Sequence, residues 1–168
     1  MSSSSSNMTA TVTEAGTTSA ILHPLCLLSV VDHYHRVAKD TSKRVVGCLL
    51  GSRSRTGNEV DIANSFGVPF EEKAGDPNVW FLDHNYLETM FRMFRKVNNK
   101  EEIVGFYSTG PLLKKNDLKI RALMRKFCTH EPIFIIIDVR PGVQGLPTTA
   151  YEAKEEIEGT GGGKEIQW

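Results

Sequence analysis

The sequence predicts an α/β fold in which helices and one mixed β-sheet form a sandwich. Short runs rich in β-branched and aromatic residues alternate along the chain with segments whose apolar residues follow helical spacing. The chain has 168 residues, of which 40% are hydrophobic and 24% charged, and these values suit one globular domain rather than a disordered chain. We find no internal repeat and no second domain.

The first half of the chain divides into a tail, a helix and two strands. Residues 1–20 are rich in Ser and Thr and lack the basic and apolar regions of a secretory signal, so we predict a disordered tail. Pro24 begins a helix expected over 24–40, because the apolar residues after it follow helical spacing. A buried strand is expected over 45–50, and a second strand over 59–66.

The second half repeats this alternation. Asp83 is placed to cap a second helix that runs to about residue 98, and either Asn116 or Asp117 can cap a third helix. The remaining predicted segments are a charged loop over 71–78, a third strand over 79–82, a fourth strand over 103–108, a central buried strand over 133–139, a strand over 148–157, and a Gly-rich hairpin over 159–163 that returns through 164–168.

Composition excludes several classes of partner. The 20 Lys and Arg residues balance 20 Asp and Glu residues, so there is no basic field for nucleic acid or for an anionic membrane surface. The longest apolar run, residues 133–137, is far shorter than a membrane-spanning helix. Cys26, Cys48 and Cys128 are widely spaced and odd in number, which indicates buried free thiols in a soluble intracellular protein rather than disulfides or a zinc finger.

Two motifs resemble a metal site and a phosphate-binding loop, but neither has the residues or the geometry that such a site needs. His33 and His35 stand two positions apart on the predicted first helix, so they point to different sides and cannot chelate one metal ion. We therefore interpret them as part of a solvated helix face. The Gly-rich run before Lys164 superficially resembles a phosphate-binding loop, but Glu165 stands where that motif needs Ser or Thr, and no helix follows.

The end of the fourth strand carries the informative motif. The run Gly-Phe-Tyr-Ser-Thr-Gly-Pro at residues 105–111 precedes Asp117 and lies downstream of Lys-Arg-Val-Val-Gly-Cys-Leu-Leu-Gly at residues 43–51. Together these runs resemble the MPN (Mov34/PAD-1 N-terminal) family, whose catalytic members are zinc isopeptidases. The resemblance implies an α-β-α sandwich around a mixed, curved β-sheet. In the catalytic members, two histidines and an aspartate of the JAMM motif hold the zinc ion, and a glutamate serves as general base.

Compared with that motif, this chain has a degenerate metal site. Arg44 stands at the glutamate position, Ser108 and Gly110 stand at the two histidine positions, and Asp117 follows at a shorter spacing than in the catalytic members. A catalytic zinc site needs about three protein ligands, and Arg44 places a fixed cation where a proton acceptor is required. We therefore predict no catalytic residues, no bound metal, no cofactor and no enzymatic activity. Whether Arg44 pairs with Asp117 stays open.

Longer runs narrow the resemblance to one branch of the family. Residues 64–72, 81–90, 105–111 and 138–151 are similar to the non-catalytic MPN subunit of the proteasome regulatory-particle lid. The resemblance covers residues 22–168 and implies an MPN domain over 21–168, without the C-terminal helices of that subunit. It also implies a scaffold in the cytoplasm and nucleus that pairs with the zinc-dependent MPN deubiquitinase of the lid and contacts other lid subunits, in ubiquitin-dependent protein degradation.

A scaffold needs an apolar face for its partner, and two predicted helices offer more apolar surface than a sheet requires. We expect the partner-binding residues to be Leu25, Leu28, Tyr86, Leu87, Met90, Met93, Phe94 and Val97. Two alternatives stay open. The chain is also similar, less closely, to the MPN subunits of translation initiation factor three and of the signalosome, and a pseudo-enzyme that binds ubiquitin is a further possibility.

Overall fold

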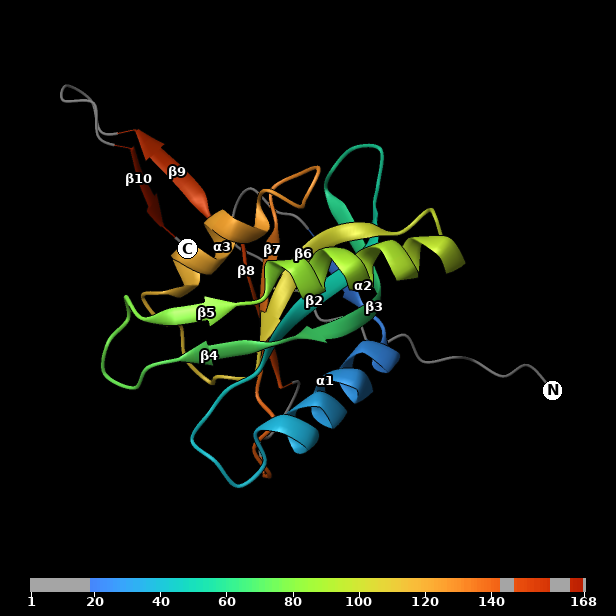
Figure 1. The fold of residues 1–168 in the computed structure, drawn as a ribbon. Coiled ribbons are helices and arrows are strands. Elements are labelled where there is room, and N and C mark those ends of the chain that lie inside the picture. The colour runs from blue at the N-terminus through green and yellow to red at the C-terminus, as the bar shows by residue number, and fades with distance from the viewer. Residues whose placement is uncertain (1–18, 143–146, 158–163, 168) are drawn as a thin grey trace.

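Figure 1 shows the fold in a computed structural model, which describes residues 19–142, 147–157 and 164–167. The helices are α1 (Pro24–Val37), α2 (His84–Val97) and α3 (Asp117–Met124). The strands are β1 (Ser19–Leu22), β2 (Val46–Arg53), β3 (Glu59–Val68), β4 (Phe70–Glu72), β5 (Trp80–Leu82), β6 (Glu102–Ser108), β7 (Ile133–Ile137), β8 (Thr148–Tyr151), β9 (Lys154–Ile157) and β10 (Lys164–Gln167).

A 6-stranded mixed sheet in the order β1-β3-β2-β6-β7-β8 organises the domain. The β1–β3 and β6–β7 pairs are parallel, and the other neighbours in this sheet are antiparallel. The pairs β4–β5 and β9–β10 form separate 2-stranded sheets. The main sheet curves strongly, and register shifts in β2 at Leu49, Leu50 and Gly51 contribute to that curvature.

Alternating side chains divide the core between the two faces of the sheet. In β2, Leu49 joins the cluster that packs against α1, whereas Cys48 and Leu50 join the cluster that packs against α2 and α3. In β7, Phe134 likewise points to the opposite face from Ile135. This period-2 alternation of fully apolar strands requires helices on both faces. The predicted α-β-α sandwich around a mixed, curved sheet is therefore confirmed (Figure 1).

The helix termini follow the local signals in the sequence. Pro24 occupies the first turn of α1, where the missing N–H leaves no hydrogen bond unmade. Asp83 caps α2, because its side chain accepts a hydrogen bond from the Tyr86 backbone N–H at 2.9 Å. Asn116 stands before α3 but makes no side-chain cap there, since its side chain is used elsewhere.

Several predicted boundaries were wrong. The predicted tail ended at residue 20, but β1 begins at Ser19 and pairs with β3. Residues 133–139 were expected to form the central strand, yet β7 ends at Ile137 and lies one place from the edge of the main sheet. Its burial comes from the helices on the two faces rather than from a central position.

Two other predicted segments also differ. The predicted loop over 71–78 begins inside a strand, because Glu71 and Glu72 belong to β4 and pair with β5. The predicted strand over 148–157 is divided into β8, which pairs with β7, and β9, which pairs with β10. Residues 159–163 of the predicted hairpin lie outside the described part of the chain.

Buried polar and sulfur groups complete the core. Contrary to the predicted solvated helix face, His33 is buried, and its Nδ1 lies 2.9 Å from the Tyr107 hydroxyl on β6. All three cysteines are buried free thiols, as predicted, and burial raises the pKa of Cys26 and of Cys128 to about 12.

None of the helices in the described ranges has the length and apolar character needed to cross a bilayer.

Candidate functional site

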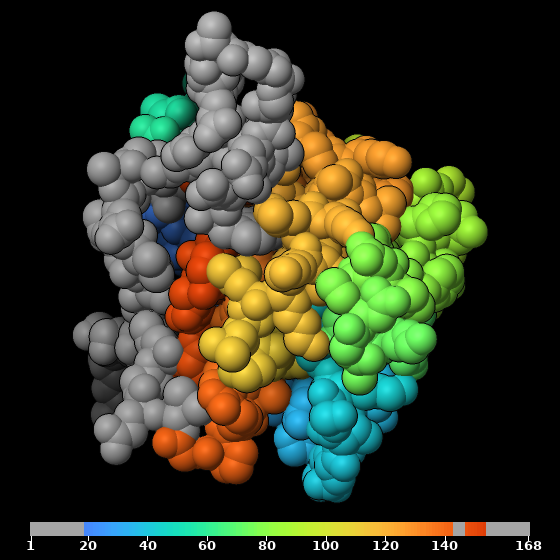
Figure 2. Space-filling view, turned by 90° about the vertical axis from the view of Figure 1, so that its left-hand side faces the viewer, coloured from blue at the N-terminus to red at the C-terminus, as the bar shows by residue number. Residues whose placement is uncertain are grey.

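The register of the main sheet places the start of β2 beside the end of β6. Val46 pairs with Ser108, and the Thr109 backbone N–H donates to the Val45 carbonyl at 3.1 Å. Arg44, two residues before the first residue of β2, therefore enters the site from the segment opposite Ser108. Figure 2 shows the left-hand side of the view in Figure 1 in space-filling form, and there the segment leading into α3 (gold) lies beside the β4–β5 segment (green).

Arg44 is the centre of a buried ion network. Its Nε and Nη2 atoms donate to the two carboxylate oxygens of Glu72, each at 3.1 Å. Its Nη1 donates to Ser108 Oγ at 3.1 Å and lies 2.7 Å from Asp117 Oδ1, while Nη2 also donates to Asn116 Oδ1 at 3.2 Å. The Arg44 side chain is 3% exposed and that of Asp117 is 0% exposed, so this pair is shielded from water. The open question of an Arg44–Asp117 pair is thus answered by direct contact.

Glu72 links the network to two further elements. It sits on β4, and its carboxylate accepts hydrogen bonds from the Lys114 ammonium and from Asn116 Nδ2, the latter at 2.8 Å. The Lys114 backbone N–H in turn donates to Asp117 Oδ2 at 2.8 Å. Two cations and two carboxylates therefore balance, and the network ties β4 and the start of β2 to the N-terminal end of α3.

The pKa values of the two carboxyl groups shift in opposite directions, although burial acts to raise both. Burial alone would raise the pKa of Glu72, but hydrogen bonds from Arg44, Lys114 and Asn116 outweigh it and lower that pKa to about 2. Burial raises the pKa of Asp117, and the nearby charge of Arg44 opposes this rise. Glu72 is consequently a stable anion at neutral pH, whereas Asp117 depends on Arg44 for its charged form.

The backbone and an aromatic ring also shape the position of Arg44. A Cβ atom added to Gly110 would lie 2.9 Å from Arg44 Cδ, so the absence of a side chain there leaves room for Arg44. The guanidinium carbon lies 5.5 Å from the centre of the Phe70 ring, within the range of a cation–π contact. The Gly110 backbone N–H donates to Ser108 Oγ at 3.2 Å.

These residues do not fit the zinc ion of the catalytic MPN members. Gly110 has no ligand atom, the Ser108 hydroxyl accepts from Arg44, and the Asp117 carboxylate faces a guanidinium at 2.7 Å that would repel a divalent cation. In the described part of the chain, no three His, Cys, Asp or Glu side chains are grouped so that they could hold a metal.

The predicted partner-binding residues divide between surface and core. Leu25 and Leu28 on α1 are 61% and 68% exposed. Met93 and Val97 on α2 are 54% and 91% exposed. Leu87, in contrast, is completely buried against the sheet, so it cannot contact a partner as predicted, because helical spacing alone does not say which flank of an apolar face turns inward.

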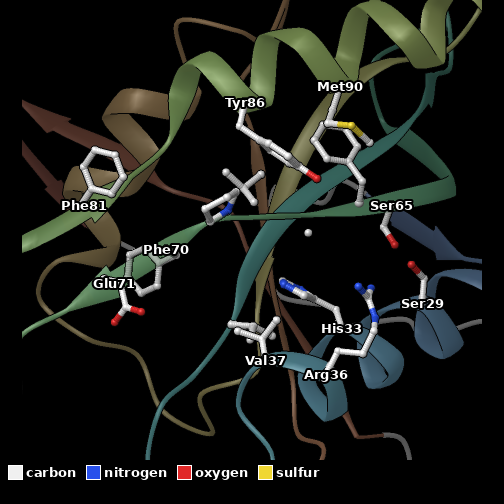
Figure 3. Close-up of a pocket in the computed structure, with 15 residues that line it drawn as sticks. Ser29, His33, Arg36, Val37, Ser65, Phe70, Glu71, Phe81, Tyr86 and Met90 are labelled. Atoms are coloured by element: carbon white, nitrogen blue, oxygen red, sulfur yellow. The ribbon is translucent and has the colours of Figure 1, made fainter.

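The other three predicted residues occupy intermediate positions on α2. Tyr86 is 40% exposed, whereas Met90 and Phe94 are half-buried and pack against the core. Tyr86 and Met90 also line a pocket of about 550 Å³ between α2, β3, β4 and α1 (Figure 3). Its other lining residues are Ser29, His33, Arg36, Val37, Val45, Ser65, Phe66, Gly67, Val68, Pro69, Phe70, Glu71 and Phe81.

Three members of the ion network were missed by reasoning from the sequence. Glu72 was assigned to a charged loop, Asn116 was considered as a helix cap, and Lys114 was not considered at all. Glu72 is 28 residues from Arg44 and 42 residues from Lys114 in the chain, and no spacing motif links them. The available signal was chemical: a guanidinium has five N–H donors, so a buried Arg44 needs more hydrogen-bond acceptors than the single Asp117 that the motif supplied.

Comparisons with known proteins agree with this geometry. Residues 15–130 match the family model described as JAB1/Mov34/MPN/PAD-1 ubiquitin protease. The chain is 60% identical over 137 residues to 26S proteasome non-ATPase regulatory subunit 7 homolog B of Arabidopsis thaliana, covering 82% of this chain and 43% of that protein. It is 52% identical over 141 residues to 26S proteasome regulatory subunit rpn8 of Schizosaccharomyces pombe, covering 84% and 43%.

A more distant relative belongs to eukaryotic translation initiation factor 3 of Mycosarcoma maydis. That protein is 36% identical over 118 residues, which is 70% of this chain and 38% of the relative. The chain spans less than half the length of each of these relatives. The fold, the residues at the strand ends and the match over residues 15–130 lead to one conclusion: the chain belongs to the JAB1/Mov34/MPN/PAD-1 family.

Proposed function

We propose that the chain is the MPN domain of a non-catalytic scaffold subunit in the lid of the proteasome regulatory particle. The observation that carries the proposal is Arg44, whose guanidinium lies at the end of the β2–β6 pair and forms ion pairs with Asp117 and Glu72. A fixed cation in this position cannot take a proton from water and disfavours a divalent metal. The identity to proteasome regulatory subunits, 60% and 52%, supports the proteasome over other complexes.

In this proposal the domain pairs with the zinc-dependent MPN deubiquitinase of the lid and contacts other lid subunits. The chain thereby serves ubiquitin-dependent degradation in the cytoplasm and nucleus by positioning that enzyme. The MPN domain, expected over residues 21–168, begins in this proposal at Ser19, where β1 joins the main sheet.

The exposed apolar side chains of α1 and α2 support a protein partner. Met93 and Val97 extend from α2 into solvent, and Leu25 and Leu28 extend from α1, which leaves apolar area that the sheet does not cover. Such surface on rigid helices suits a permanent interface, because burial of apolar area supplies the binding free energy.

The proposal is tested with Met93→Asp and Val97→Asp in the full-length chain, by calorimetric titration with the catalytic MPN subunit of the same organism. Because both side chains are more than half exposed, each variant should fold, and affinity should fall at least about tenfold, or about 1.4 kcal/mol. Leu112→Asp is the matched control, since Leu112 is 74% exposed and lies outside both helices. Unchanged affinity in both α2 variants would refute this interface.

Co-purification from cells separates the candidate complexes. Recovery of proteasome lid subunits supports the proposal, whereas recovery of translation initiation factor or signalosome subunits overturns it. An NMR titration with ubiquitin tests the pseudo-enzyme alternative, since shift changes confined to the surroundings of Arg44 and Ser108 would favour a ubiquitin-binding site over a pure scaffold.

A further inference from the structure

The pocket between α1 and α2 has a polar end that apolar pairing does not explain. Ser29 and Arg36 reach it from α1 and Ser65 reaches it from β3, and Figure 3 shows their polar groups gathered at one end, away from Phe70 and Phe81. A pocket that received apolar side chains alone would not need hydroxyl and guanidinium donors at one end. These donors indicate a polar group on the segment that enters the pocket.

Ser65 is the first independent sign of a ligand. The residue is 4% exposed, and its Oγ makes no hydrogen bond to nitrogen or oxygen within the described residues. Its side chain does pair with the Cys26 thiol, but a thiol is a weak hydrogen-bonding partner. A buried hydroxyl without a good partner costs free energy, and a partner's acceptor group in the pocket would remove that cost.

Arg36 supplies the positive charge. Its Nε donates to Asp32 Oδ2 at 2.8 Å, and both side chains of this pair are about two-thirds exposed, at 66% and 64%. Exposed pairs four residues apart on a helix contribute little, about 0.3–0.5 kcal/mol, so Asp32 holds Arg36 weakly. Among the described residues, neither terminal nitrogen of Arg36 donates a hydrogen bond, so its terminal N–H groups are available to a carboxylate.

The other ionisable groups at the pocket do not compete for an anion. Burial lowers the pKa of His33, and its Nδ1 is already bonded to Tyr107, so the imidazole is neutral near pH 7. Glu71 belongs to the opposite end of the pocket, where Lys43 Nζ pairs with it at 3.0 Å. The charge of Arg36 is opposed at the polar end by that of Asp32, so a carboxylate would bind through the terminal N–H groups of Arg36 that Asp32 does not use.

We propose that this polar end binds the carboxylate of an Asp or Glu side chain on the partner segment that packs against α2. The Arg36 fork supplies two charge-assisted donors and the Ser65 hydroxyl supplies a third, which matches the acceptors of one carboxylate. The apolar surface of α2 provides affinity, and the carboxylate fixes the register of the partner segment. This inference rests on the proposed function, because it names the chemistry of the segment that pairs with α2.

The test uses Arg36→Glu, Arg36→Lys and Ser65→Ala in the full-length chain, each titrated with the catalytic MPN subunit. Arg36→Glu should weaken binding about ten- to a hundredfold, Arg36→Lys should restore part of the loss, and Ser65→Ala should weaken binding severalfold. Arg55→Glu makes the same change in net charge on the exposed β2–β3 turn, away from the pocket, and should bind as the unmodified chain does. Circular dichroism checks that each variant is folded.

The outcomes separate the two proposals. If Met93→Asp loses binding while Arg36→Glu binds normally, the carboxylate inference is wrong and the proposed pairing stands. An equal loss for Arg36→Glu and Arg55→Glu also overturns the inference, because it would reflect overall charge rather than a site. If neither Met93→Asp nor Arg36→Glu changes affinity, both the inference and the proposed α2 interface fail.

Discussion

Removal of the Arg44 guanidinium should destabilise the fold strongly, because it would leave two carboxylates without their shared cation. Asp117 is 0% exposed, and the Glu72 side chain is 16% exposed. Removing one member of a buried ion pair typically costs about 3–5 kcal/mol. For Arg44→Ala we expect a loss within this range, together with a melting temperature lower by about 6–20 °C for a chain of this size.

Urea denaturation of the Arg44→Ala variant measures this loss directly, provided that the slope against urea concentration is unchanged. Arg92→Ala is the matched control, because the Arg92 side chain is 75% exposed and its pair with Glu88 should contribute at most about 0.5 kcal/mol. A loss below about 1 kcal/mol for Arg44→Ala would refute the view that the network is a buried, coupled unit.

A double-mutant cycle adds a second check. In the Asp117→Asn background the buried charge that depends on Arg44 is gone, so Arg44→Ala should cost about 0.5–3 kcal/mol less than it does alone. Simple additivity of the two substitutions would show that the 2.7 Å contact between Arg44 and Asp117 contributes no coupling energy.

Three further outcomes are expected. The pKa of Glu72 is about 2 in the fold and 4.5 ordinarily, so its ionised form stabilises the fold fully above pH 4.5. In urea titrations, the free energy of unfolding of the unmodified chain should therefore exceed that of Glu72→Gln by less and less as the pH falls from 4.5 to 2. A difference that stays constant over this range would contradict this. Gly105→Ala should destabilise by about 1–3 kcal/mol or more, because its Cβ would collide with the Ile133 carbonyl oxygen; a melting temperature equal to that of the unmodified chain would contradict this packing. Tyr107→Phe should lower the free energy of unfolding by about 1–2 kcal/mol, since it leaves His33 Nδ1 without its partner, and an increase in stability would argue against that hydrogen bond.

Local signals were sufficient for most of the fold. Pro24 and Asp83 each act within one helical turn, so the beginnings of α1 and α2 follow from neighbouring residues. The nearly continuous apolar run over residues 45–50 likewise predicts a strand buried on both faces. The place of β7 in the sheet was missed because five consecutive apolar residues look the same in a central strand and in one near the edge.

The part of the site that lies in local motifs was predicted, and the part that depends on distant contacts was not. Arg44, Ser108, Gly110 and Asp117 come from two motifs, and the β2–β6 register brings them together. Glu72 was not predicted, because its contact with Arg44 depends on how β4 folds back toward α3.

His33 shows the limit of helical geometry in the prediction. Spacing correctly argues that His33 and His35 point to different sides, but it does not reveal that one of them faces the sheet. The partner of His33 is Tyr107, which lies 74 residues away in the chain. Leu87 was misassigned for a related reason, since an apolar helix face does not by itself distinguish residues that pack on the sheet from those that stay exposed.

Native mass spectrometry of the full-length chain co-purified with the catalytic MPN subunit tests the central claim most directly. We expect a one-to-one complex that carries a single zinc ion, and this ion should stay with the catalytic subunit when the complex dissociates, because Arg44 and Asp117 neutralise each other in this chain. A zinc ion that stays with this chain after dissociation, or a chain that never associates with the catalytic subunit, would show that the chain is not a metal-free scaffold for that enzyme.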